Sequence, residues 1–298
     1  MNVKYMIIIV DKPSGMTSQK VVSRIKHALD QKIKIGHTGT LDPMCTGVLP
    51  VLIGADTTLS DLFLPQKAYR ASFILGVQTD TQDITGTVLE EKPVNVSKDD
   101  VLRILPEFTG KILQTPPMYS AIKINGEKLY NLARAGKTVE RASRKIEIYS
   151  IDYCGYDEEN GFYIDVACSK GTYIRTLCND IGDALGTGAC MTSLRRTASN
   201  GFYENDVHSL DEVIEHAQNG TIEELSIDSQ TPFMHLDEIV LPEDGLKYYL
   251  NGGIIASGRI KEKTEYGKRY RAKSIDGRFL GLCEYIESGI KSIWLKDR

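Results

Sequence analysis

The sequence predicts an α+β fold, in which an antiparallel-rich mixed sheet with flanking helices is followed by a small β-rich domain. Three observations predict it. Segments that alternate apolar and polar side chains outnumber segments with helical spacing. Few helices separate the strands, which favours hairpins over a doubly wound sheet. At 298 residues the chain exceeds a typical single domain, so one large and one small domain are expected.

Each element is predicted from its hydrophobic period or its end signals. Apolar side chains recur at helical spacing after Ser18, a candidate N-cap, and Ser97 is a second candidate cap. Residues 145–156 and 162–169 alternate on either side of a DEENG turn, which predicts a hairpin. The other predicted strands are 5–10, 48–54, 69–77 and 190–201, and the predicted helices are 18–29, 96–105, 172–185 and 206–218.

The stretch GHTGTLDPMCTGVLP, residues 36–50, carries the most chemical information. One carboxylate, Asp42, stands in a loop of glycines, threonines and a proline, directly before an apolar strand. Such a loop can hold one side chain at a fixed angle, which suits a catalytic carboxylate. Two other interpretations remain open on spacing alone. Asp42 can cap a simple turn, and His37, Asp42 and Cys45 can suggest a metal site, although no second pair at ligand spacing supports it.

Five blocks, in order, resemble the pseudouridine synthases of the TruB family, bacterial enzymes that modify the T loop of tRNA. The resemblance covers roughly residues 8–200. The blocks are DKPSGMTS (11–18), the GHTGTLDPMCTGVLP loop, KAYRASFILGVQTDTQDITG (67–86), TPPMYSAIKINGEKLYNLARAG (115–136) and SKGTYIRTLCNDIGDALG (169–186). One departure is visible: where the family often has Gly-x-Ala-Thr-Lys, this chain reads GADTT, so Thr58 replaces the lysine.

The resemblance implies two domains, a catalytic domain over residues 1–236 and an RNA-binding domain of the PUA type over 237–298. The second assignment rests on a pattern of short strands, glycine turns and basic side chains; an ordinary small β-domain with a solvated basic face is the alternative. The basic segment 123–145 resembles the mobile loop that closes on the RNA in this family. A solvated charged helix and loop is its alternative.

The net charge of −4 is unexpected for a protein that binds RNA phosphates. The charge is unevenly spread, however. Residues 197–245 contain twelve Asp or Glu and no Lys or Arg, whereas residues 251–298 carry eleven Lys or Arg and six Asp or Glu, a net of +5. Overall acidity therefore argues only against a uniformly basic surface, and a local basic stripe stays compatible with RNA binding.

The resemblance assigns the catalytic roles. Conversion of uridine to pseudouridine breaks the N-glycosidic bond, turns the base and rejoins it through C5, with no redox step, and a carboxylate nucleophile serves it. That nucleophile is Asp42, and attack on the ribose or on the base both stay open. Arg175 in GTYIRT would keep Asp42 ionised and fix its direction. Tyr69 would stack on the extruded base or transfer a proton. A helix-surface arginine and a core tyrosine are the plain alternatives.

Further residues are expected to bind the substrate. His37 would support the T loop as the target base leaves its stack, and Tyr173 would line the same pocket. Lys12 would contact a phosphate or the catalytic loop. Asp83 would hydrogen-bond the flipped nucleotide, with a turn carboxylate as the alternative.

The predicted function is the isomerisation of uridine to pseudouridine at tRNA position 55, in the T stem-loop. A guide-RNA-directed relative and a non-catalytic tRNA-binding or tRNA-folding module are the alternatives. No cofactor, metal or protein partner is expected, and the protein is predicted to be a monomer. The apolar run MIIIV is too short for a signal or membrane segment, and the six cysteines form no redox motif, which together predict a cytoplasmic protein.

Overall fold

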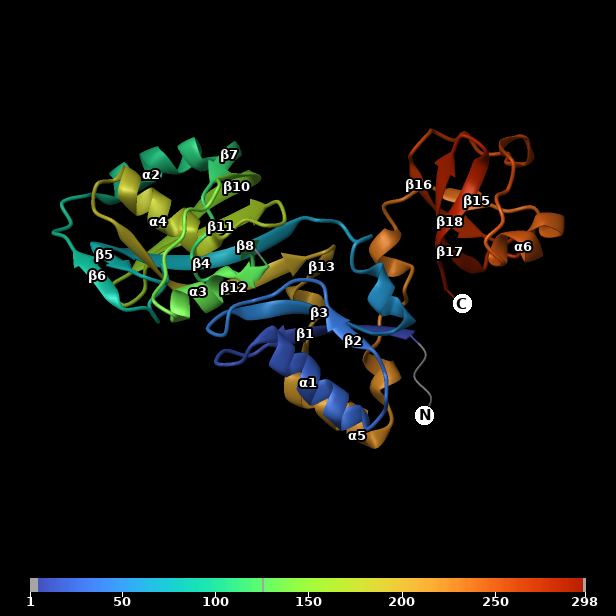
Figure 1. Ribbon diagram of the computed structural model, residues 1–298, viewed down its shortest axis with the longest axis horizontal. Helices are drawn as coiled ribbons and strands as arrows, with labels where there is room; N and C mark the ends of the chain where they lie inside the picture. Colours follow the sequence, from blue (N-terminus) through green and yellow to red (C-terminus); the bar gives the residue numbers. More distant parts are fainter. Residues whose placement is uncertain (1–4, 125, 297–298) are drawn as a thin grey trace.

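The computed structural model describes residues 5–124 and 126–296 (Figure 1). Within them the α-helices are α1 (Ser18–Leu29), α2 (Lys98–Ile104), α3 (Leu129–Arg134), α4 (Ile174–Ala184), α5 (Leu210–Asn219) and α6 (Glu243–Leu250). The strands of the large sheet are β1 (Tyr5–Lys12), β2 (Ile35–His37), β3 (Thr46–Gly54), β4 (Lys67–Leu75), β7 (Gly110–Gln114), β10 (Arg144–Asp157), β11 (Gly161–Cys168), β12 (Ala189–Ser199), β13 (Phe202–Tyr203) and β14 (His208–Ser209). Two small hairpins are β5 (Val77–Thr79) with β6 (Val88–Glu91), and β8 (Lys123–Ile124) with β9 (Glu127–Lys128).

The described residues form a ten-stranded mixed sheet in the order β14-β1-β3-β12-β4-β11-β10-β7, with β13 paired to β12 and β2 paired to β3. Among the described strands of this sheet, the β1–β14 and β3–β12 pairs are parallel and the others are antiparallel. The predicted antiparallel-rich α+β class is therefore confirmed, and so is the hairpin of β10 and β11. The parallel β3–β12 pair joins the two halves of the sheet at the centre, next to the Asp42 loop.

Helices cover the two halves of this sheet separately (Figure 1). Under the β1–β3 half, α1 and α5 lie side by side and bury Val21, Ile25 and Val213 against strand residues such as Ile8. Over the β4–β11 half, α4 and α2 pack Leu177 and Val101 into a second apolar cluster. Two separate apolar clusters thus hold the strands from which the Asp42 loop and α4 project.

Two predicted element ends differ in the structure. The N-cap of α1 is Thr17, whose hydroxyl accepts from the backbone N–H of Lys20, while Ser18 is buried and bonds to Leu41 instead. The helix predicted to begin at residue 206 begins at Leu210, because Ser209 caps it and residues 208–209 pair with β1. At α1 the contact of Ser18 with Leu41, and at α5 the pairing of residues 208–209 with β1, determine which hydroxyl caps the helix.

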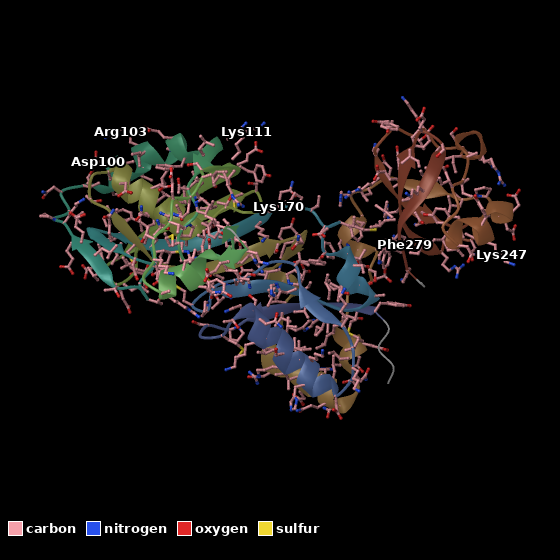
Figure 2. All side chains as sticks on the ribbon, viewed as in Figure 1. Asp100, Arg103, Lys111, Lys170, Lys247 and Phe279 are labelled. Atoms are coloured by element: carbon pink, nitrogen blue, oxygen red, sulfur yellow. The ribbon has the colours of Figure 1, made fainter. Side chains whose placement is uncertain are left out.

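A separate four-stranded sheet forms the C-terminal domain, from β15 (Glu238–Val240), β16 (Arg269–Lys273), β17 (Phe279–Ile286) and β18 (Gly289–Leu295). This confirms the small β-rich domain, whereas the boundary between residues 236 and 237 stays a prediction. Phe279 and Trp294 pack with Phe233 and Phe63 in one buried cluster, so the two sheets share apolar contacts. Figure 2 places Phe279 on the side of this domain that faces the rest of the chain, and Lys247 on its far side.

The acidic segment 197–245 neutralises much of the basic tail. Lys268 pairs with Asp237 at 2.9 Å, and Glu238 lies 3.0 Å from Arg271 and 2.8 Å from Lys273. Lys296 pairs with Asp228 at 2.7 Å, and Arg259 with Asp244. The formal charge of the tail therefore overstates its free positive charge.

A buried carboxylate lies at the junction of the two domains. Asp56, in the 3-10 turn η1 (Ala55–Leu59) after β3, has no exposed surface and accepts a hydrogen bond of 2.8 Å from Ser229. Its second carboxylate oxygen has no partner. Burial raises the pKa of Asp56 to about 6, and the Ser229 hydrogen bond and the charge of Lys296 oppose that rise only in part.

We predict that Asp56→Asn stabilises the protein above pH 7 by about 1–3 kcal/mol, since one pKa unit corresponds to about 1.4 kcal/mol. Unfolded chains lose the Asp56 proton near pH 3.8, the ordinary pKa of an aspartate, whereas folded chains lose it near pH 6. The contribution of Asp56 to stability therefore falls as pH rises through that window. The amide removes this loss and keeps an acceptor for Ser229. Urea unfolding of the variant and wild type at pH 4 and pH 7.5 measures the difference.

The matched control is Asp61→Asn, an exposed carboxylate in the same segment, which should leave the unfolding free energy unchanged at both pH values. An Asp56→Asn protein that is less stable than wild type at pH 7.5 would contradict the assignment of Asp56 as a destabilising buried charge.

Candidate active site

Lys12 fixes the loop that carries the candidate nucleophile. The loop runs from β2 to β3, and the Lys12 ammonium donates hydrogen bonds to the carbonyls of Pro43 at 3.2 Å and Cys45 at 2.6 Å. On the other side, the hydroxyl of Ser18 accepts from the Leu41 backbone N–H at 2.8 Å. Lys12 has no exposed surface, so of its two predicted roles the structure favours contact with the catalytic loop.

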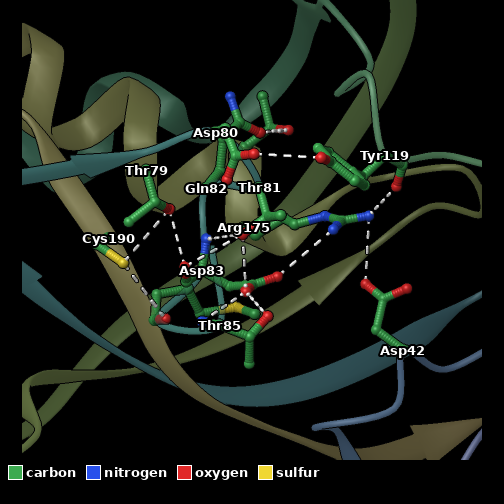
Figure 3. Close-up of polar contacts among 12 residues, drawn as sticks. Asp42, Thr79, Asp80, Thr81, Gln82, Asp83, Thr85, Tyr119, Arg175 and Cys190 are labelled. Carbon is green, nitrogen blue, oxygen red and sulfur yellow. Dashed lines mark hydrogen bonds and ion pairs between the residues drawn. The ribbon is translucent and has the colours of Figure 1, made fainter. Parts of the chain in front are cut away.

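Asp42 stands on this loop opposite Arg175, which lies in the first turn of α4 (Figure 3). The Nη2 atom of Arg175 is 3.3 Å from Oδ2 of Asp42. The Arg175 side chain is 7% exposed, whereas that of Asp42 remains 39% exposed. Burial raises the pKa of Asp42, and the Arg175 charge opposes that rise. The carboxylate is therefore accessible from solvent on one side and held by a buried cation on the other.

Arg175 has two further partners. Its Nη1 atom lies 3.5 Å from Oδ2 of Asp83, and its Nη2 also donates to the backbone carbonyl of Tyr119. The Tyr119 phenol in turn donates to Asp80 at 3.1 Å. Figure 3 shows the guanidinium between these acceptors, with Asp42 and Tyr119 approached by the same nitrogen. One buried cation thus connects the Asp42 loop, the turn after β5 and the segment after β7.

The contacts of Asp83 favour the turn role that was its alternative. Its carboxylate accepts from the hydroxyl of Thr81 at 2.9 Å, and from the backbone N–H and hydroxyl of Thr85 at 3.0 and 2.5 Å. Only 4% of Asp83 is exposed. With these bonds and the ion pair to Arg175, the Asp83 carboxylate orients the arginine from behind.

The remaining predicted residues lie around this centre. Tyr69, on β4, is buried in the same apolar cluster as Leu41, and burial raises the pKa of its phenol to about 12. His37 ends β2 with Nδ1 buried and unpartnered. Tyr173 precedes α4, where its backbone N–H and carbonyl both bond to the side chain of Gln114. Thr58 is exposed, and its hydroxyl donates to the carbonyl of Ala55.

Sequence reasoning missed four residues: Tyr119 and Asp80, described above, and Lys67 and Arg196. Lys67 begins β4, and Arg196 lies opposite Tyr69 in the β4–β12 register. Arg196 has no exposed surface; its Nε donates to the Val48 carbonyl at 2.7 Å. The Lys-x-Tyr spacing of Lys67 was the one sequence signal available for these groups. The other three residues gave no such signal, because Tyr119 meets Asp80, and Arg196 meets Lys67, only through tertiary contacts.

No helix among the described residues is long and apolar enough to cross a membrane. No cluster of three or more His, Cys, Asp or Glu side chains suited to a metal ion occurs in residues 5–124 and 126–296.

Sequence comparisons match residues 26–246 to one family. Residues 26–174 match the family described as TruB family pseudouridylate synthase (N terminal domain), and residues 175–246 match the tRNA pseudouridylate synthase B C-terminal domain. A relative from Clostridium acetobutylicum, named tRNA pseudouridine synthase B, is 42% identical over 97% of this chain and 98% of its own length. This chain belongs to the TruB family of pseudouridine synthases. It is thus an enzyme of the isomerase class.

Other relatives agree. The tRNA pseudouridine synthase B of Alkaliphilus oremlandii is 44% identical to this TruB-family chain over 84% of its length and 83% of the relative's. A solved structure of a Cbf5-Nop10-Gar1 complex matches with a TM-score of 0.73 and 26% identity over 98% of this chain and 83% of that one. An H/ACA RNP bound to a substrate RNA containing 2′-deoxyuridine matches with a TM-score of 0.74 at 24% identity, over 97% of this chain and 84% of that one, and supports the fold.

We predict that Arg175→Ala lowers the free energy of unfolding by about 2–5 kcal/mol, because it leaves the buried Asp83 carboxylate without its cation. It should also move the acidic limb of the single-turnover pH profile to higher pH, because Arg175 opposes the rise of the Asp42 pKa. Chemical denaturation and rates of pseudouridine formation at saturating RNA measure the two effects.

The double variant Arg175→Ala/Asp83→Asn separates the roles of this arginine. Neutralising Asp83 should recover part of the lost stability and none of the lost rate, because Asp42 still lacks its partner. Arg175→Lys should recover the rate only in part, since one ammonium cannot reproduce the planar guanidinium fork. An Arg175→Ala enzyme with a wild-type rate would place Arg175 outside the reacting centre.

Proposed function

We propose that this enzyme converts the uridine at position 55, in the T loop of tRNA, to pseudouridine, with Asp42 as the nucleophile. The observation that carries the proposal is the ion pair between Asp42 and the buried Arg175 at 3.3 Å, on a loop fixed by Lys12. The names of the relatives support tRNA as the substrate class. The single exposed side of the Asp42 carboxylate is where a flipped nucleotide would approach.

The reaction is an isomerisation, so no group enters or leaves. The bond between N1 of the base and C1′ of the ribose breaks, a bond from C5 to C1′ forms, and a proton moves from C5 to N1. A covalent bond to Asp42 would hold one fragment while the base turns, and attack on the ribose or on the base both accomplish this. Arg175 would keep the carboxylate ionised before attack and stabilise it again on release.

Tyr69 would form the apolar wall of the pocket. Because burial raises its pKa to about 12, the phenol is uncharged at neutral pH, and its ring can stack on the uracil face. His37, at the end of β2, would support the T loop from beside the same pocket. Tyr173, half-exposed in front of α4, would line the opposite wall.

The loop after β7 would close over the RNA. Residues 123–145 are basic, and α3 lies in this segment with Leu129 fully buried. The loop is tied at its base by a hydrogen bond of 2.8 Å between Thr115 and Ser143. Because the Tyr119 carbonyl contacts Arg175, closure of this segment and the position of Arg175 would be coupled.

We predict that purified wild-type protein forms pseudouridine at position 55 of an unmodified tRNA with EDTA and no other addition. Asp42→Asn should bind that tRNA with nearly unchanged affinity and form no product, because the amide is not a nucleophile here. Site-specific mapping of pseudouridine and a filter-binding assay measure the two properties.

The outcomes distinguish the candidates. Product that forms only when a guide RNA is added would identify a guide-directed enzyme. Tight binding with no product from wild type would identify a tRNA-binding or tRNA-folding module. Turnover by Asp42→Asn at a rate near wild type would leave Asp42 as a turn residue. A tRNA with cytidine in place of the target uridine controls for modification elsewhere.

We propose that the C-terminal domain, of the PUA type, grips the tRNA away from the target base. Removal of residues 237–298 would expose the apolar cluster around Phe233 and Phe63, so charge substitutions test this role better than truncation. Lys261 and Lys263 are exposed and form no ion pair in the described residues.

We predict that Lys261→Gln/Lys263→Gln weakens tRNA binding and flattens the slope of log affinity against log salt by about 1–2, with little change in the single-turnover rate at saturating RNA. Lys26→Gln/Lys32→Gln, two exposed lysines of the catalytic domain, is the matched control and should change the slope less. An unchanged slope combined with a lost single-turnover rate would show that the domain completes the active site instead.

A further inference from the structure

The cationic side chains of Lys67 and Arg196, beside the Asp42 loop, have no carboxylate partner among the described residues. Arg196 has no exposed surface, and its Nη1 atom is buried with no hydrogen-bond partner. Lys67 is half-buried, and its ammonium forms no hydrogen bond or ion pair with any described residue. His37 adds a buried Nδ1 without a partner. In most proteins, charges this deeply placed are matched by carboxylates.

The cationic nitrogens converge on one point. A Cβ added to Gly39 would lie 2.6 Å from Nζ of Lys67 and 3.5 Å from Nη1 of Arg196. The second guanidinium nitrogen of Arg196 donates to the Gly39 carbonyl at 3.2 Å. Because residue 39 is a glycine, the Lys67 ammonium can lie against the loop at this position. The Arg196 guanidinium lies next to the same residue.

The electrostatic consequences are visible in the neighbouring groups. Burial and the Arg196 charge lower the pKa of Lys67 to about 8, and Lys170 acts in the same direction. Burial, Arg196 and Lys67 together lower the pKa of His37. An anion placed against Lys67 would reverse these shifts and relieve the repulsion between the two cations.

The position of the cluster identifies the anion. Lys67 is two residues before Tyr69 on β4, and Gly39 is three residues before Asp42 on the loop. A uridine that enters the pocket between Asp42 and Tyr69 carries a phosphodiester on each side of its ribose. If the target uridine lies there, the anionic group nearest Lys67 would be a phosphate of the RNA backbone beside it.

We propose that Lys67 contacts a phosphodiester flanking the reacting uridine, with Arg196 as a fixed second positive charge behind it. This inference rests on the proposed function for the identity of the RNA. Arg196 has no exposed surface, so Lys67 makes the contact and Arg196 contributes only its charge. The site is a receptor for one backbone phosphate, and it places the nucleotide before the chemistry begins.

The test uses a T stem-loop RNA and the Asp42→Asn protein, so that the substrate is not converted during binding. Lys67→Gln in this background should weaken binding about tenfold and reduce the salt slope by about 1, as loss of one charged phosphate contact predicts. Lys67→Arg should keep most of the affinity. Lys111→Gln, an exposed lysine on the edge strand β7 (Figure 2), is the matched control and should bind like its parent.

A second arm identifies the phosphate. An uncharged methylphosphonate replaces the phosphate on the 5′ side or on the 3′ side of the target uridine. At one of these positions the parent protein should lose affinity about tenfold, and Lys67→Gln should lose little more, because the partner of the lysine is already gone. Gly39→Ala, which adds a methyl group 2.6 Å from the Lys67 ammonium, should weaken binding of unmodified RNA without a change in charge.

Equal loss by Lys67→Gln on every RNA, whichever phosphate is neutral, would overturn the proposal, and so would an unchanged affinity and salt slope. Circular dichroism of each variant separates loss of binding from loss of fold. Failure of the proposed function is seen elsewhere: wild type would form no pseudouridine, even if the methylphosphonate result identified a phosphate contact.

Discussion

The guanidinium of Arg175 is the interaction on which the site depends. It is almost fully buried, and a buried cation must find acceptors in fixed directions. Asp83, the Tyr119 carbonyl and Asp42 supply them from three separate segments. Only the Asp42 carboxylate among these acceptors keeps substantial exposure. The pairing that neutralises the arginine thus also fixes the direction of the exposed Asp42 carboxylate.

The fold could be predicted where local pattern and tertiary environment agree. β1, β3 and the β10–β11 hairpin follow their hydrophobic period because each has a face or a whole strand in an apolar core. The short strands β5, β6 and β14 could not be predicted in this way. β6 is exposed along its whole length, and β14 exists through its parallel pairing with β1, a contact across nearly two hundred residues. Such elements have no period of their own to detect.

In the candidate site, too, some features could be predicted from the sequence and others could not. The loop composition and the family resemblance identified Asp42 and Arg175, and the structure brings them together. Spacing could not decide where the donors of Lys12 point or which groups surround Asp83. Both are saturated by neighbours, Lys12 by loop carbonyls and Asp83 by threonines and Arg175. A lysine or an aspartate that supports the loop cannot be told from one that contacts the substrate by residue type alone. The two are separated by whether the polar atoms of the side chain already have hydrogen-bond partners within the protein.

The pairing of charged groups within the protein also explains the acidity of the chain. Five cations of the C-terminal domain, Arg259, Lys268, Arg271, Lys273 and Lys296, pair with carboxylates of the acidic segment 197–245. Charges paired in this way are neutralised locally, so they add little to an external field. The cations beside the Asp42 loop differ, since Lys67 and Arg196 lack any carboxylate partner among the described residues. Recognition of an anionic polymer by an acidic protein therefore requires few positive groups, provided that these are left unpaired where the substrate is to be bound.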